Sequence, residues 1–214
     1  MRKFFALDSP LMTALATLAD LVFCNVLFCL LSLPLFTVGA SLTALYDCTL
    51  SIVEQREESL IIRQFWNAFR RGFKRSTALG LICIAAFALL WGYQSVVGML
   101  PDGLRRMYQV TFLVLAFLWL AVFQYIFPLQ AKFRMGVGQT LKTAALLSAA
   151  ALPWTLASLA VTAGAVYLTF FMDPNGLGVA VFLWFFAVFA IVAYLNSFFF
   201  RRAFKRLAPE QGKS

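Results

Sequence analysis

The chain contains no histidine and carries little charge. Of its 214 residues, 13% are charged and only nine are Asp or Glu. The lack of histidine excludes histidine metal sites and histidine acid–base catalysis. The few carboxylates form no cluster suited to a metal, and the sequence contains no phosphate-binding loop, GxSxG motif or HExxH motif. We therefore predict that the protein is not an enzyme and that it binds no metal or other cofactor.

Cysteine is also scarce, and its placement excludes a disulfide or zinc framework. The four cysteines lie within apolar runs and show no CxxC spacing: Cys24, Cys29, Cys48 and Cys83. A free cysteine in such surroundings behaves as a small hydrophobic residue. We expect all four to pack between helices.

Hydrophobic residues, in contrast, make up 62% of the chain, and 24 of them are phenylalanine. Ordinary soluble domains contain roughly 45–50%, and a helix needs about 20 apolar residues to span a bilayer. The sequence therefore predicts a single all-α integral membrane domain over 1–214, a polytopic transmembrane helical bundle. About six spans are expected, at 11–33, 35–53, 77–100, 107–131, 144–171 and 177–200. Asp8–Pro10 resembles a helix N-cap, and 173–176 a turn before the last span.

The net charge of +9 favours a membrane surface over nucleic acid as the partner. The basic residues gather at the ends of the apolar runs, where orientation signals and contacts to anionic headgroups are expected. If the first two runs cross the membrane as a tight hairpin, both termini are cytoplasmic and only Arg105 and Arg106 face outward. A re-entrant second segment, turning at Pro34–Gly39, satisfies the charges equally well.

The segment at about 59–76 carries a stripe of aromatic residues beside a broad basic face. This pattern predicts an amphipathic helix at the cytoplasmic surface that lies among anionic headgroups or docks on a partner protein, and the two uses are compatible. The aromatic residues are Phe65, Trp66, Phe69 and Phe73, and the basic residues are Arg63, Arg70, Arg71, Lys74 and Arg75.

Three polar residues stand inside the first two apolar runs: Asp20, Asn25 and Asp47. A carboxylate near mid-membrane is costly and should face the protein interior. One interpretation makes the three a proton- or cation-coupled site. The other has the two carboxylates, Asp20 and Asp47, form hydrogen bonds across helices to Asn25, Thr43, Gln124 or Asn196. The absence of an intramembrane Lys or Arg favours the structural interpretation.

Small residues recur every four positions in the second run, which predicts close approach of another helix. The two stripes are Gly39, Thr43 and Asp47, and Ala40, Ala44 and Cys48. Pro34 and Gly39 together predict a helix break between the first two spans. Pro128 and Pro153 predict kinks in the fourth and fifth spans.

Several blocks of the sequence resemble the YesL-like family of bacterial membrane proteins, which is defined by a domain of unknown function, number 624. The blocks include 18–21 with Asn25, the run 32–46, the aromatic–basic stretch 65–76 and the later block 127–133. Members of that family typically occur beside carbohydrate ABC importers and polysaccharide-degrading enzymes in Gram-positive bacteria. The resemblance implies a cell-membrane protein with a role in sugar uptake, and it supplies no catalytic residues.

Two functional hypotheses follow. The first is an accessory or assembly factor for a carbohydrate ABC importer, which docks on the permease subunits through its small-residue faces and its basic helix. The second is a small secondary transporter or channel that uses Asp20, Asn25 and Asp47 beside the Pro34–Gly39 break.

Overall fold

The computed structural model describes residues 10–56, 60–97, 101–171 and 177–205, and every regular element in these ranges is a helix. The expected cap at Asp8–Pro10, apart from its last residue, and the expected turn at 173–176 lie outside the described residues. Helices α1 (Pro10–Leu31) and α2 (Val38–Glu54) are joined by the short 3₁₀ helix η1 (Leu35–Thr37).

The first two predicted spans form a hairpin that turns at Pro34. Pro34 has an extended backbone (φ −76°, ψ 117°) and precedes η1, and Thr37 closes the turn because its Oγ1 donates to the Pro34 carbonyl at 2.6 Å. The predicted break at Pro34 is therefore confirmed. The same prediction for Gly39 is wrong, since Gly39 is the second residue of α2.

Helix α2 is the centre of the molecule. In its apolar stretch 72% of the residues are buried, whereas the share is 22% or less in the other five long apolar helices. Helices α1, α3, α4 and α8 all pack against it. A helix surrounded in this way needs small side chains, and α2 supplies them on several faces. Its buried residues include Gly39, Ala40, Ser41, Thr43, Ala44, Cys48 and Ser51.

Helix α3 (Ile61–Val97) is one continuous helix of 37 residues, roughly 55 Å long. It pairs with α4 (Asp102–Phe133). The expectation of a separate interfacial helix at 59–76 is therefore wrong: its described part joins the third span without a break. No proline interrupts the segment, so backbone hydrogen bonding continues through it. The basic half of α3 extends along the axis of the span instead of lying flat at the surface.

The predicted fifth span at 144–171 is divided into α5 (Val137–Ala150) and α6 (Leu152–Phe171). The backbone leaves the helical conformation at Ala151 (φ −114°, ψ 34°). Pro153, at the second position of α6, has no N–H to bond back to the preceding turn. The Oγ1 of Thr155 donates to the Ser148 carbonyl at 3.1 Å instead. The proline thus ends one helix and begins another.

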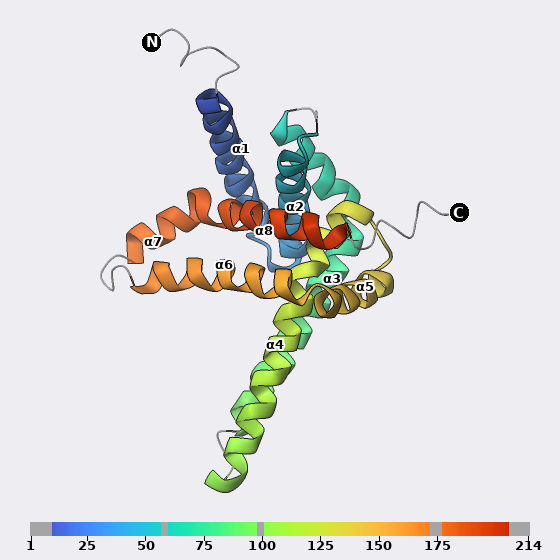
Figure 1. Ribbon diagram of the computed structural model, residues 1–214, viewed down its shortest axis with the longest axis vertical. Coiled ribbons are helices and arrows are strands. Elements are labelled where there is room, and N and C mark those ends of the chain that lie inside the picture. The colour runs from blue at the N-terminus through green and yellow to red at the C-terminus, as the bar shows by residue number, and fades with distance from the viewer. Residues whose placement is uncertain (1–9, 57–59, 98–100, 172–176, 206–214) are drawn as a thin grey trace.

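The last predicted span is confirmed as a continuous helical run, but it changes pitch. It consists of α7 (Leu177–Leu183), the π-helix η2 (Trp184–Val188) and α8 (Phe189–Phe204). Figure 1 shows that the α3–α4 hairpin and the hairpin of α6 with α7 and α8 extend from the centre in different directions. The three hairpins therefore share α2 but diverge away from it.

Apolar side chains cover the outer surfaces of these hairpins. Leu89, Trp91, Leu113 and Val181 are each at least 65% exposed. Exposed apolar surface on this scale is expected where a helix contacts lipid. Within the described residues six helices are long and apolar enough to cross a membrane. The protein is an all-α, multi-pass membrane protein.

Candidate functional site

Helices α2 and α3 run antiparallel and touch through their backbones. A Cβ atom added at Gly39 would lie 2.2 Å from the Ser76 carbonyl oxygen and 3.1 Å from the Gly80 Cα. One turn away, Thr43 Oγ1 donates to Ser76 Oγ at 2.9 Å. The small-residue stripe therefore serves helix packing, as predicted, but its partner is α3 of the same chain. This stripe offers no surface for another protein.

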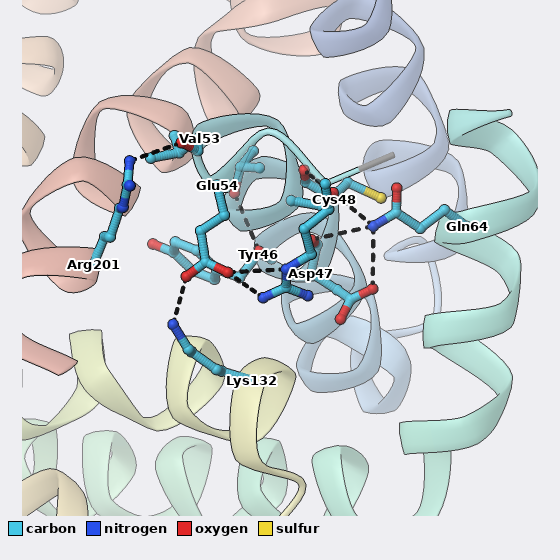
Figure 2. Close-up of polar contacts among 11 residues, drawn as sticks. Tyr46, Asp47, Cys48, Val53, Glu54, Gln64, Lys132 and Arg201 are labelled. Atoms are coloured by element: carbon cyan, nitrogen blue, oxygen red, sulfur yellow. Dashed lines mark hydrogen bonds and ion pairs between the residues drawn. The ribbon is translucent and has the colours of Figure 1, made fainter. Parts of the chain in front are cut away.

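Asp47 lies farther along the same interface, and 8% of its surface is exposed. Gln64 of α3 reaches it from across the interface (Figure 2): its Nε2 lies 3.4 Å from Asp47 Oδ2 and 2.7 Å from Ser51 Oγ. Thr43, one of the partners expected for the intramembrane polar residues, bonds to Ser76 instead. Asp47 is therefore held by an amide whose role the sequence did not reveal.

Asn25 fastens α1 to the π-helix. Its side chain is fully buried. The Nδ2 group donates to the carbonyls of Trp184 and Phe185 at 2.9 and 2.6 Å, and Oδ1 accepts the Ala190 N–H at 2.7 Å. A π-turn leaves backbone groups without their usual partners, and Asn25 satisfies three of them. These contacts support the structural interpretation of this residue.

Asp20 lies on α1 and is partly exposed. Among the described residues it forms no hydrogen bond or ion pair, and no hydrogen bond joins any two of Asp20, Asn25 and Asp47. Two other expected partners are engaged elsewhere: Gln124 donates to the Thr155 carbonyl, and Asn196 to Thr162 Oγ1. The structure therefore does not bring the three polar residues together as one site.

The C-terminal end of α2 carries a charged network that sequence reasoning missed. Glu54 accepts hydrogen bonds from Lys132 of α4 and from Arg56, and Arg201 of α8 donates to the Val53 carbonyl at 3.0 Å. Figure 2 shows Lys132 pointing to the Glu54 carboxylate and Arg201 pointing to the Val53 carbonyl. The sequence did contain a signal for this network, namely a carboxylate in the last turn of a predicted span, close to several basic residues. Helices α2, α4 and α8 thus end at one side of the molecule.

The residues of the predicted amphipathic segment differ in their exposure to solvent. Arg63, Arg70, Arg71, Lys74 and Arg75 are all exposed, and we call these five residues the basic face. Trp66 is 47% exposed and stacks on Phe69 with ring centroids 6.0 Å apart. Phe69 and Phe73 are partly buried.

Phe65 is the exception among the aromatic residues of this segment. It is fully buried in the cluster of α1, α2 and α3 residues that includes Leu21, Cys24 and Leu45. Its expected contact with headgroups or a partner is therefore wrong. A fully enclosed ring gains more from core packing than from the interface, and this contact anchors the segment to the rest of the protein.

Arg134 joins the basic face from a distant part of the chain. It ends α4 in a left-handed conformation (φ 50°), and Arg75 Nη1 donates to its carbonyl at 2.8 Å. A groove of about 670 Å³ lies here, and all its charged side chains are basic: Arg70, Arg71, Lys74, Arg75 and Arg134. Its chemistry suits an anion. No group of three or more Cys, Asp or Glu residues in the described part of the chain is placed to hold a metal.

A family model described as "Protein of unknown function, DUF624" matches residues 21–92. Over this segment, which is about a third of the chain, the protein is similar to the DUF624 family. The match confirms the predicted resemblance, because this domain of unknown function defines the YesL-like family. It covers the second half of α1, all of α2 and most of α3, and thus includes Asn25, the Gly39 contact, Asp47 and the basic face.

One curated relative of this chain is "Uncharacterized protein YteU" of Bacillus subtilis (strain 168). The two are 25% identical over 142 residues, which amount to 66% of this chain. The aligned part spans 63% of the length of the relative, which is less than two thirds. No solved structure matches the chain.

Proposed function

We propose that this protein is an accessory or assembly factor for a carbohydrate ABC importer in the bacterial cell membrane, and that it contacts the importer through its basic face. The observation that carries the proposal is the exposure of all five cations of this face on a helix that is anchored by a buried phenylalanine. The resemblance to the YesL-like family favours sugar uptake as the process.

The length of α3 supports a docking role for its basic half. The helix has 37 residues, whereas about 20 are enough to span the hydrocarbon core. The remaining turns carry the basic face beyond the lipid, in line with the rest of the helix. A rigid, charged extension of this kind can approach the cytoplasmic parts of a neighbouring permease at little cost in conformational entropy.

The distribution of charge supports a cytoplasmic position for this face. Lys132, Arg134 and Arg201 lie at the same side of the molecule as the end of α2. Arg105 and Arg106 begin α4, whose 32 residues place them roughly 40 Å away. An arrangement with the basic ends inside agrees with the positive-inside rule, and it puts both termini in the cytoplasm.

The intramembrane polar residues favour an accessory role over transport. Asn25 is used to hold the π-helix, and Asp47 contacts Gln64 within the α2–α3 interface. Since the small-residue stripe of α2 is covered by α3, a permease would contact the exposed apolar sides of the diverging hairpins instead.

The test is affinity purification of the full-length protein from native membranes after mild cross-linking, with subunits identified by mass spectrometry. We expect a carbohydrate-importer permease to copurify with the wild type, and its yield to fall several-fold for an Arg63→Gln/Arg70→Gln variant. Arg105→Gln/Arg106→Gln removes the same charge from the other end of the molecule and should leave the yield unchanged. Wild-type protein recovered without any permease would refute the proposal.

A further inference from the structure

Helices α2, α3 and α4 together line two cavities of opposite chemistry. The first is a cleft of about 80 Å³ whose charged side chains are Arg71, Arg75, Arg134 and Asp47. Three of these residues, the arginines, also line the larger basic groove, so cleft and groove adjoin. The cleft therefore carries a net charge of about +2, and it lies beside the C-terminal end of α4.

Two of the three guanidinium groups of the cleft form hydrogen bonds within the protein, before any ligand arrives. Arg75 donates to the Arg134 carbonyl at 2.8 Å, and Arg71 Nε donates to the Asn67 carbonyl at 3.1 Å. None of the three arginines forms an ion pair within the described ranges of the chain. Guanidinium groups with free N–H donors in a fixed geometry bind phosphate oxygens strongly.

The second cavity is an apolar groove of about 190 Å³. Its lining includes Leu42 of α2, Gly80 and Phe87 of α3, and Phe123 and Phe127 of α4, and it contains no charged residue. Because Gly39 and Gly80 have no side chains, the backbones of α2 and α3 form part of its wall. An open apolar groove on a membrane-facing surface suits a hydrocarbon chain.

The two cavities are aligned along the same helices. On α4, Phe127 lines the apolar groove and Arg134 lines the cleft, which separates the two by roughly 10 Å along the helix axis. On α2, Leu42 and Thr43 are neighbours that line the groove and the cleft respectively. The cationic site thus lies toward the cytoplasm and the apolar site toward the middle of the membrane, in the order in which a phospholipid presents its phosphate and its acyl chains.

We propose that this seam is a binding site for one anionic phospholipid, whose phosphate contacts Arg71, Arg75 and Arg134 and whose acyl chain occupies the groove beside Phe123 and Phe127. The negative charge of Asp47 repels the phosphate, but the three positive charges of the arginines outweigh this repulsion. The net positive charge of the cleft favours an anionic headgroup over a zwitterionic one. The site shares Arg71 and Arg75 with the basic face, whereas Arg134 and the apolar groove lie outside that face.

The experiment is native mass spectrometry of the full-length protein in detergent, with phosphatidylglycerol and phosphatidylcholine of identical acyl chains added at equal concentration. The wild type should retain one phosphatidylglycerol in clear preference to phosphatidylcholine. Arg71→Gln/Arg134→Gln should weaken retention by roughly tenfold or more, since each basic residue near the headgroup contributes about a kcal/mol. Arg105→Gln/Arg106→Gln is the charge-matched control and should bind as the wild type does.

A second pair of variants tests the apolar half without changing charge. Ile84 lines the groove and is 47% exposed, whereas Ile82 on the same helix is 42% exposed and lies outside the groove. Ile84→Trp should fill the groove and reduce lipid retention several-fold, and Ile82→Trp should have no effect. Equal retention of the two lipids, an equal loss in the Arg105/Arg106 control, or displacement of the lipid by millimolar glycerol phosphate would each overturn the proposal.

Discussion

Replacement of Gly39 by alanine tests whether the contact between α2 and α3 holds the molecule together. The new Cβ would lie 2.2 Å from the Ser76 carbonyl oxygen, whereas ordinary contacts of this kind need roughly 3.5 Å. The two helices would have to separate by about 1 Å. Since the contacting atoms belong to backbones on both sides, no rotamer change can relieve the clash.

The expected cost follows from three contributions. Overpacking costs about 1–3 kcal/mol, and loss of the Thr43–Ser76 hydrogen bond (2.9 Å) costs about 0.6 kcal/mol more. The better helix propensity of alanine returns up to about 1 kcal/mol. We therefore expect Gly39→Ala to lower the free energy of unfolding by roughly 1–3 kcal/mol.

Two other glycines provide a graded control series. A Cβ at Gly80 would lie 3.2 Å from the Gly39 Cα, and a Cβ at Gly92, on the same helix, would meet nothing within 4 Å. Gly80→Ala should be intermediate, and Gly92→Ala neutral or slightly stabilising. Unfolding in a detergent micelle by titrated SDS, followed by far-UV circular dichroism, gives the three midpoints. If Gly39→Ala unfolds at the same SDS fraction as Gly92→Ala, the backbone contact between α2 and α3 does not stabilise the fold.

Four further substitutions, with Trp66→Ala as a comparison, test other parts of the fold and site in the same assay. Asn25→Ala should cost about 2 kcal/mol, since three buried hydrogen bonds are lost, and an unchanged midpoint would contradict its role at the π-helix. Phe65→Ala should lower the free energy of unfolding by about 3–5 kcal/mol, and Trp66→Ala, on the exposed side, should lower it much less. A larger loss for Trp66→Ala than for Phe65→Ala would contradict the burial of Phe65. Glu54→Gln should cost about 1–3 kcal/mol through its two ion pairs, a loss that high salt in the wild type should partly reproduce. Asp20→Asn should leave stability unchanged, while abolished substrate uptake in proteoliposomes would favour the transporter hypothesis instead.

The predictions from sequence succeeded where the physical cause is local. A bilayer demands about 20 consecutive apolar residues whatever surrounds them, so five of the six spans lie near their expected positions. The hairpin at Pro34 was predictable because proline lacks an N–H in any context. The prediction for Pro153 was too weak, because a proline near the start of a helix begins a new helix instead of kinking an existing one.

The environment of single side chains could not be predicted in the same way. Hydrophobic periodicity assigned Phe65 and Trp66 to one stripe, yet only Phe65 is enclosed by α1 and α2. Continuity of α3 through the basic segment was also missed, because a change from a polar to an apolar pattern does not by itself end a helix.

The sequence alone thus determined that this is a multi-pass helical membrane protein with a basic segment excluded from lipid, because the cost of charge and unpaired backbone in hydrocarbon depends on composition and spacing. Only the tertiary structure decided what the polar residues do. Asn25 binds a carbonyl 160 residues away, and Arg134 meets Arg75 across a separation of 59. Such pairs arise when helices that share α2 are packed around it, and no local pattern of residues specifies them.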